Sequence, residues 1–157
     1  IVLQAEPELA ETFVKRLDGE LRCAVRAARD GARLTQGTIH IAADPTRHVV
    51  FEAGQPPCLR LVEREPIDGA RPSANLLYGT FARTGTPAVG IVLSGLGEDG
   101  AKGLKLMREA DCRTFAQARN SAVVAEAPAA AIAADAVESE LPIEELAAAA
   151  LAACSRR

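Results

Sequence analysis

In the first half of the chain, the spacing between apolar residues differs from one segment to the next. From Glu8 to Leu21 apolar residues recur every three or four positions, which predicts a helix with one buried face that ends near Asp18-Gly19. From Thr38 to Ala42 apolar and polar residues alternate, which predicts a strand, and Asp44-Pro45 predicts a turn after it. The expected buried face of the helix comprises Leu9, Phe13, Val14, Leu17 and Leu21.

Shorter apolar runs in the first half predict further strands. Ile1 to Leu3 is typical of the end of a strand, and Cys23 to Ala28 is a candidate strand before a turn at Asp30-Gly31. His48 to Phe51 is expected to return from the Asp44-Pro45 turn, and Leu59 to Val62 predicts a third short strand.

The second half has clearer patterns. Ser73 is a good N-cap for a helix that places Leu76, Leu77 and Phe81 on one face. Residues 88–94 form a continuous apolar run, as in a strand buried inside a parallel sheet. A helix over 101–110 follows, with Leu104, Leu106 and Met107 as its apolar residues, and then a strand over 113–117.

The last segment is rich in alanine, with 13 Ala among the 27 residues from 127 to 153. This composition predicts helices that pack closely, one of which begins at Pro142 with Glu144 and Glu145 in its first turn. Strands that alternate with helices predict an α/β fold with a mainly parallel sheet. At 157 residues the chain has the length of one domain.

Composition and charge exclude several functions. Only 3% of the residues are aromatic, so the core must be aliphatic and base-stacking platforms are not expected. The 18 basic and 21 acidic side chains give a net charge of −3, which excludes the strongly basic surface of a sequence-independent nucleic-acid binder. No apolar run is long enough to cross a bilayer, and we expect no membrane insertion.

Four cysteines are spread along the chain at Cys23, Cys58, Cys112 and Cys154. Their spacing fits neither a zinc site nor a redox pair. We therefore expect small, buried apolar side chains, a cytoplasmic setting and no metal.

Only one segment has the form of a ligand site in an α/β fold, where ligands bind beyond the carboxyl ends of the strands. It is the run Gly95 to Gly100, which follows the apolar strand and precedes a helix. Asp99 is then expected near a helix N-terminus, which keeps a carboxylate ionised. Asp99 has two interpretations, a helix cap or a functional carboxylate. The run lacks the Lys-Ser/Thr ending of a P-loop.

The remaining candidates for chemistry have simpler interpretations. His40 and His48 are the only imidazoles, they belong to no metal-ligand pattern, and we expect both to be hydrogen-bonded structural residues. Ser73 is expected to cap a helix, and no Gly-x-Ser-x-Gly nucleophile motif occurs in the chain.

Five segments in order resemble the catalytic domain of the CheB chemotaxis methylesterases. The best match is GIVLSGLGEDGAKGLKLMREA, which is similar to that family's strand, glycine-rich turn and helix. The others are DGARLTQGTIHIA with His48 after it, RPSANLLYGTFA, AQARNSAVVAEAPAAAI and LPIEEL. The resemblance covers essentially residues 1–157 and begins after the family's first strand–turn–helix.

The resemblance implies a doubly wound α/β domain with helices on both faces of a mainly parallel sheet and a small β-hairpin. It also implies a protein-glutamate methylesterase that hydrolyses glutamyl methyl esters on the cytoplasmic helices of chemoreceptors. Some relatives deamidate glutamines as well. The family needs no metal or cofactor, and it usually has an upstream receiver domain of a two-component system.

The family's Ser-His-Asp triad carries over only in part. Its aspartate corresponds to Asp99, and Gly95, Leu96 and Gly97 would line the active-site wall. Its serine precedes the first residue of this chain, and its histidine position, after Gln in IVLQAEP, is occupied by Ala5 with Glu6 beside it.

Two further positions differ from the family pattern. The family's Gly-Met-Pro loop is Glu126-Ala127-Pro128 here, and a carboxylate near Ser73 has become Asn75. The acidic side chain of Glu126 would reshape one wall of the site.

Three functional hypotheses follow. The first is a methylesterase domain by descent that is weak or inactive, a pseudoenzyme, because Ala5 cannot accept a proton. The second is a non-catalytic binding or regulatory module in chemotaxis-type signalling. The third is an esterase-like domain whose nucleophile is a Cys or another Ser. In two variants of the first hypothesis, Glu6 or His48 replaces the histidine as the base.

Overall fold

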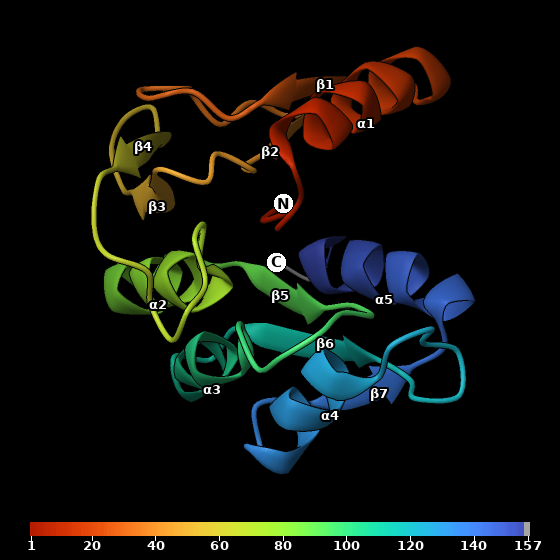
Figure 1. Ribbon diagram of the computed structural model, residues 1–157. Coiled ribbons are helices and arrows are strands. Elements are labelled where there is room, and N and C mark those ends of the chain that lie inside the picture. Colours follow the sequence, from red (N-terminus) through yellow and green to blue (C-terminus); the bar gives the residue numbers. More distant parts are fainter. Residues whose placement is uncertain (156–157) are drawn as a thin grey trace. The chain divides into compact units, whose positions relative to one another are not determined.

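The computed structural model describes residues 1–155, which divide into two compact units. The first unit comprises residues 1–77, and the second begins at Tyr78. Helix α2 (Ala74–Thr84) contains the boundary between them. Figure 1 labels the elements of both units.

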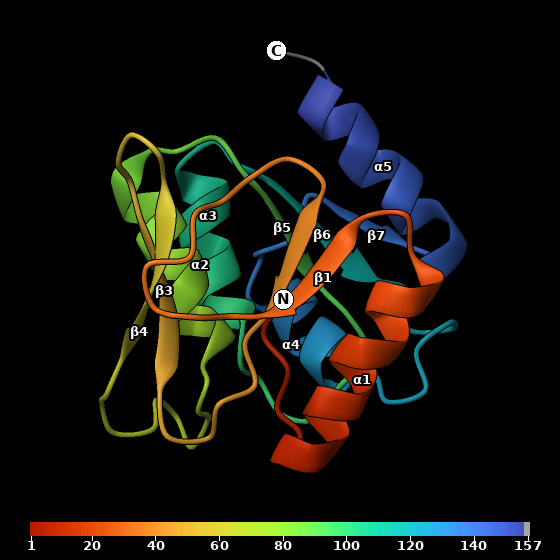
Figure 2. The same cartoon turned by 90° about the horizontal axis from the view of Figure 1, so that it is seen from above.

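The first unit contains a helix on a two-stranded parallel sheet. Helix α1 (Pro7–Glu20) packs on strand β1 (Ala24–Ala27), and β1 pairs with β2 (Thr38–Ile41). Figure 2 shows α1 beside β1. An isolated parallel bridge joins Val2 to Ala42, so the chain before α1 runs beside the end of β2. The predicted helix and both predicted strands are confirmed.

The predicted buried face of α1 is right at Val14 and Leu17, which are half-buried, and wrong at Leu9, Phe13 and Leu21, which are exposed. Only Ala10 is buried, whereas Leu9 and Phe13 are 63% and 38% exposed. The helix ends at Glu20, next to the predicted Asp18-Gly19, and the Asp18 carboxylate accepts a hydrogen bond of 2.8 Å from Val25 N–H and pairs with Arg26. The Val25 hydrogen bond holds the pKa of the Asp18 carboxyl below its usual value. Asp18 thus connects the helix to β1.

An antiparallel hairpin completes the first unit. Strand β3 (His48–Glu52) pairs with β4 (Cys58–Val62), with His48 opposite Val62. The strand at 48–51 was expected to return against 38–42, and that pairing is wrong because β2 pairs with β1 instead. Val49 and Leu59 of the hairpin pack with Ala42 in one core cluster.

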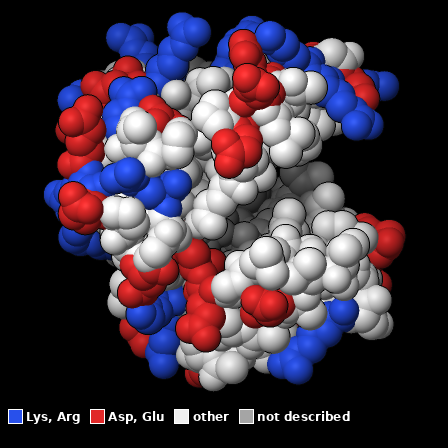
Figure 3. All heavy atoms as spheres, in the orientation of Figure 1, with Lys and Arg blue, Asp and Glu red and all other residues white. Residues whose placement is uncertain are grey.

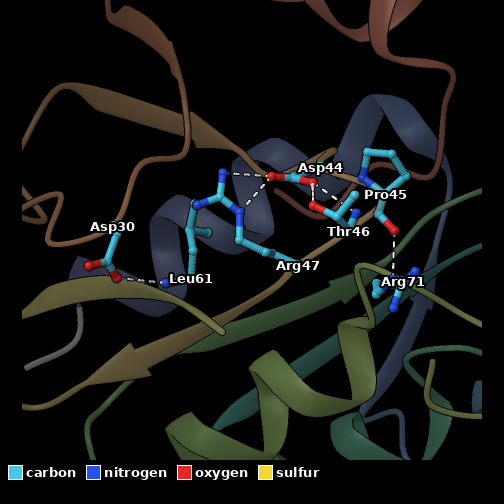
Figure 4. A network of polar contacts seen from close by, with 7 residues as sticks. All are labelled: Asp30, Asp44, Pro45, Thr46, Arg47, Leu61 and Arg71. Carbon is cyan, nitrogen blue, oxygen red and sulfur yellow. Dashed lines mark hydrogen bonds and ion pairs between the residues drawn. The ribbon is translucent and has the colours of Figure 1, made fainter. Parts of the chain in front are cut away.

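A network of polar contacts fixes the turn before β3 (Figure 4). The Asp44 carboxylate accepts hydrogen bonds from the Thr46 N–H at 2.8 Å and hydroxyl at 2.6 Å, and it pairs with the Arg47 guanidinium at 2.7 Å. The Pro45 carbonyl accepts a hydrogen bond from Arg71 Nε at 2.6 Å. The predicted Asp44-Pro45 turn is therefore confirmed, and Arg71 ties it to the segment before α2.

The two histidines have different surroundings. His48 is fully buried, and its Nδ1 accepts a hydrogen bond from Ser73 N–H at 3.2 Å while its Nε2 donates to the Glu65 carbonyl at 3.1 Å. The expected structural role of His48 is confirmed. His40 differs from expectation, because both its ring nitrogens are buried without a hydrogen-bond partner among the described residues.

The second unit is a three-stranded parallel sheet with helices on both faces. Its strands are β5 (Val89–Val92), β6 (Arg113–Gln117) and β7 (Ser139–Leu141), in that order. The helices are α3 (Ala101–Glu109), α4 (Glu126–Ala133) and α5 (Ile143–Ser155). Strand β7 was not predicted, because SEL is short and mostly polar.

The alternation of side chains along β5 explains this layering. Val92 packs in one cluster with residues of α3 and α4, such as Leu104 and Ala131, whereas Val89 and Ile91 pack in another with Leu146 of α5. Gly90 lets α3 approach closely, because a Cβ there would collide with the Leu104 side chain. The alanine-rich segment thus supplies small buried residues, as predicted.

Helix α2 begins as expected. The Ser73 hydroxyl accepts a hydrogen bond from Leu76 N–H at 3.4 Å, and Ser73 is fully buried. Ser73 is thereby the N-cap that the sequence predicts.

The cysteines only partly match the prediction of buried apolar side chains. Cys112 is buried, but Cys23 and Cys58 are half-buried and Cys154 is exposed, all four as free thiols. Residues 1–155 contain no group of three or more His, Cys, Asp and Glu side chains placed to hold a metal ion. Within the same range, no helix is both long and apolar enough to span a membrane.

Charged side chains of both signs are interspersed on the face shown in Figure 3. Exposed pairs such as Lys15–Glu11 and Arg16–Glu20 lie one helical turn apart on α1. Such pairs contribute only about 0.3–0.5 kcal/mol each, so the apolar clusters and buried hydrogen bonds determine stability.

The contrast between the histidines predicts opposite mutational effects. His48→Leu removes both hydrogen bonds of a fully buried imidazole, to Ser73 N–H and the Glu65 carbonyl, and we expect a loss of about 2–3 kcal/mol in the free energy of unfolding. His40→Leu removes two unsatisfied nitrogens and should be neutral or stabilising within about 1 kcal/mol. Urea unfolding of both variants measures the difference, and equal losses would contradict the assignment.

Candidate active site

Asp99 lies in the turn that connects β5 to α3. Gly97 and Gly100 have φ values of +73° and +102°, in the left-handed region that strains residues with a Cβ. Gly100, rather than Asp99, occupies the N-cap position of α3. Asp99 is half-buried beside the first turn of that helix. The glycines therefore bring a carboxylate to the carboxyl end of β5, as the sequence predicts.

The loops after β5 and β6 are joined by hydrogen bonds along their length. Val124 N–H donates to the Ser94 hydroxyl oxygen at 3.0 Å, and the Val124 carbonyl accepts from Gly95 N–H at 3.0 Å. Ala127 N–H donates to the Gly95 carbonyl at 3.0 Å. The turn that carries Asp99 is thus fixed against the segment that leads into α4.

The side chain of Glu126 also contributes to the contact between these two loops. Its Oε2 accepts a hydrogen bond from Gly97 N–H at 3.0 Å, although the carboxylate remains exposed. The family that the sequence resembles has a glycine at position 126. This chain instead places a negative charge at Gly97, two residues before Asp99. The expectation that Glu126 reshapes one wall of the active site stays a prediction.

Gln117 is a further residue of the site, which the sequence analysis did not single out. It is 5% exposed at the end of β6, where its Oε1 accepts from Ser94 N–H at 2.9 Å and its Nε2 donates to the Ser121 carbonyl at 2.8 Å. One amide therefore satisfies backbone groups of both loops. The available signal was a polar residue at the end of an apolar strand.

Tyr78 is the second residue that the sequence analysis missed. Its hydroxyl donates to the Ile91 carbonyl of β5 at 2.6 Å. Burial raises the pKa of Tyr78 to about 12, and the negative charge of Asp99 acts in the same direction. A neutral phenol and a carboxylate therefore share the carboxyl-terminal side of β5.

The predicted wall residues Gly95, Leu96 and Gly97 lie on the same turn as Asp99. Ala5 and Glu6 belong to the first unit, where Glu6 is the N-cap residue of α1 and makes no side-chain capping bond. A replacement carboxylate base needs burial to raise its proton affinity. Glu6 is exposed, which argues against that role.

His48 cannot serve as a replacement base. Both of its ring nitrogens are engaged, with the Ser73 N–H and the Glu65 carbonyl, and its side chain is fully buried. A general base must reach the nucleophile's proton. The hypothesis that His48 reaches into the site is therefore wrong.

The first unit contains a separate groove of about 590 Å³ between α1, β1 and the turn before β3. Its buried apolar lining includes Ala10, Val25 and Ile41, and its charged lining includes the Asp44–Arg47 pair drawn in Figure 4. None of the predicted site residues lines it.

The environment of Tyr78 predicts a pH-dependent loss of stability. Between about pH 10, the usual tyrosine pKa, and about pH 12 the unfolded chain releases the phenol proton while the folded chain keeps it. The folded state then binds more protons, so stability falls as the pH rises through this window, and Tyr78→Phe should fall less.

The measurement is direct because the chain has one Tyr and no Trp. We expect the ultraviolet absorbance of tyrosinate to titrate near pH 12 in the folded chain and near pH 10 in urea. A folded midpoint near pH 10 would contradict a buried, neutral hydroxyl.

Comparisons with known proteins find relatives along almost the whole chain. The family model described as CheB methylesterase matches residues 1–150. A protein-glutamate methylesterase/protein-glutamine glutaminase of Rhizobium etli is 41% identical over 138 residues, which are 87% of this chain and 40% of that protein. A protein of Gluconobacter oxydans with the same name is 37% identical across 100% of this chain and 46% of its own length.

The fold is also that of a solved structure. The CheB methylesterase catalytic domain of Thermotoga maritima matches with a TM-score of 0.90 and 22% identity, over 96% of this chain and 80% of that domain. The expected α/β fold is thus confirmed, and the chain spans less than half the length of these curated relatives. The chain belongs to the CheB methylesterase family.

Proposed function

We propose that this chain forms most of a protein-glutamate methylesterase domain of chemotaxis, in which Asp99 is the acidic member of a Ser-His-Asp triad. The observation that carries the proposal is the fixed glycine turn that holds Asp99 at the carboxyl end of β5. The substrates would be glutamyl methyl esters, and by the names of the relatives also glutamines, on the cytoplasmic helices of chemoreceptors.

In such a triad each residue has a distinct task. The serine attacks the ester carbonyl, the histidine takes its proton and returns it to the departing methanol, and the aspartate orients and stabilises the imidazolium. Asp99 suits the last task because its turn is immobilised by the segment 124–127. By the family resemblance, the serine would belong to the family's first strand–turn–helix.

Ala5 in the place of the histidine makes the domain a weak or inactive member. A methyl group cannot accept a proton, and loss of a triad's base typically lowers kcat by about 10⁴- to 10⁶-fold. The exposed Glu6 and the fully engaged His48 offer no substitute. We therefore propose a pseudoenzyme by descent, acting in the cytoplasm and joined in the full protein to a receiver domain.

The same observations favour a second candidate, a non-catalytic module that still binds receptor helices. The fold and the Asp99 turn persist although Ala5 removes the proton acceptor. Binding without turnover is what such a combination would produce.

Cys58 is disfavoured as an alternative nucleophile. Partial burial, together with Glu52, raises the pKa of the Cys58 thiol. Its sulfur donates to the Glu52 carboxylate at 3.6 Å. Since the thiolate is the reactive form, this environment disfavours it as a nucleophile.

The test is methanol release from a methyl-esterified chemoreceptor fragment by the full-length protein and its Ala5→His variant. We expect little or no turnover by the natural protein and an increase of at least about 10³-fold in the variant. Adding Asp99→Ala to Ala5→His should lower kcat again by about 10⁴-fold, because the imidazole loses its orienting carboxylate.

Ala32→His is the matched control, since Ala32 is another half-buried alanine of the first unit. It should not restore turnover. Enzyme-like turnover by the natural protein that survives Asp99→Ala would refute both the role of Asp99 and the pseudoenzyme. If the Ala5→His variant releases no methanol and the protein still binds the receptor fragment tightly, the result would favour the binding module.

A further inference from the structure

The groove of the first unit lies at the carboxyl ends of two parallel strands. Its lining includes residues 27–29 at the end of β1 and residues 41–45 at the end of β2. In an open α/β sheet, ligands bind beyond the carboxyl ends of the strands. The volume of about 590 Å³ also lies within the range of roughly 300–1,000 Å³ that is typical of small-molecule sites.

Apolar side chains from one helix and two strands line the groove. Ala10 and Val14 belong to α1, whereas Val25 belongs to β1 and Ile41 to β2. Ala10, Val25 and Ile41 are buried, so the packing of α1 on the sheet fixes their positions. Every other side chain that lines the groove is apolar or charged. The lining side chains therefore suit a ligand with an apolar body, and they offer its polar head group only charged partners.

The charged side chains of the lining leave one cation in excess. They are the basic Lys15, Arg26, Arg29 and Arg47 and the acidic Glu11, Asp18 and Asp44. Three ion pairs use the acidic residues, Lys15–Glu11 at 3.1 Å, Arg26–Asp18 at 3.0 Å and Arg47–Asp44 at 2.7 Å. Among residues 1–155, no acidic side chain pairs with the Arg29 guanidinium. An unpaired guanidinium is a binding group for a carboxylate, which it can hold through two parallel hydrogen bonds.

The backbone on both sides of Arg29 is held in place. Ala28 N–H donates to the Ile41 carbonyl at 2.8 Å, which continues the pairing of β1 with β2 beyond the end of β1. The Asp30 carboxylate accepts from Leu61 N–H at 2.9 Å, as drawn in Figure 4. Arg29 is thus presented by a fixed segment, and only its side chain has to be ordered when a ligand binds.

We propose that this groove binds a small carboxylic acid with an aliphatic chain, whose carboxylate pairs with Arg29 while the chain covers Val14, Val25 and Ile41. One excess cation suits one negative charge, whereas a dianion such as a phosphate monoester would also be repelled by Asp18 and Asp44. The inference is independent of the proposed function, because no residue of the Asp99 turn lines the groove.

The first test is calorimetry of the full-length protein with straight-chain carboxylates from acetate to decanoate. We expect the affinity to rise about two- to fourfold with each added CH₂, because each one buries more apolar surface. 1-Octanol, which lacks the charge, should bind about fivefold more weakly than octanoate. Equal affinity of 1-octanol and octanoate would overturn the carboxylate site, and an affinity that does not rise with chain length would overturn the apolar groove.

Two variants locate the ligand. Arg29→Gln should weaken the binding of octanoate about fivefold and leave that of 1-octanol unchanged. Ala27→Phe places a ring in the groove from an exposed position of its lining, so the core stays intact. It should weaken the binding of both ligands at least about fivefold, since the ring occupies the space of the chain.

The matched controls are Arg33→Gln and Ala53→Phe, at exposed residues of the first unit that do not line the groove. Each should change the affinity for octanoate less than about twofold. Equal effects of Arg29→Gln and Arg33→Gln, or of Ala27→Phe and Ala53→Phe, would show that octanoate binds elsewhere and would overturn the assignment. Absence of binding at every chain length would overturn it as well.

Discussion

The side-chain amide of Gln117 satisfies two backbone groups that the sheet leaves without a strand partner. It lies buried where β6 ends, and it bonds to Ser94 N–H after β5 and to the Ser121 carbonyl after β6. These two hydrogen bonds add to those that join the loops directly, between Val124 and Ser94 and between Gly95 and Val124. Gln117 thereby helps to hold the start of the turn that carries Asp99, because that turn continues directly from Ser94.

The sequence predicted most elements of the fold but not all of their partners. The helix over α1, the strands β1, β2 and β6, and the N-cap Ser73 follow from local pattern and chemistry. The partner of β3 could not be predicted, because a hairpin of β2 with β3 and a hairpin of β3 with β4 have the same local sequence pattern. The face of α1 failed for a related reason, since periodicity identifies an apolar stripe but not the surface that covers it.

The candidate site shows the same division. Asp99 could be predicted because glycines at positive φ leave a local signature around it. Tyr78 and Gln117 could not, because each acts through a backbone group far away in sequence, Ile91 and Ser94 respectively. A tyrosine on an amphipathic helix and a glutamine at a strand end are ordinary residues until the tertiary contacts are known.

The glycines in and before the Asp99 turn are required by packing and by backbone conformation, independently of any catalytic role of Asp99. Gly90 admits α3 against the sheet, and Gly97 and Gly100 adopt conformations that other residues resist. These requirements hold whether or not an ester is ever hydrolysed, so the turn would persist in a domain that has lost its base. Position 5 is different, because Ala5 is half-buried beside the exposed Glu6 and does not have a positive φ that would disfavour a larger side chain. We therefore propose that the residue at position 5, more than the turn, would distinguish an esterase from a binding module.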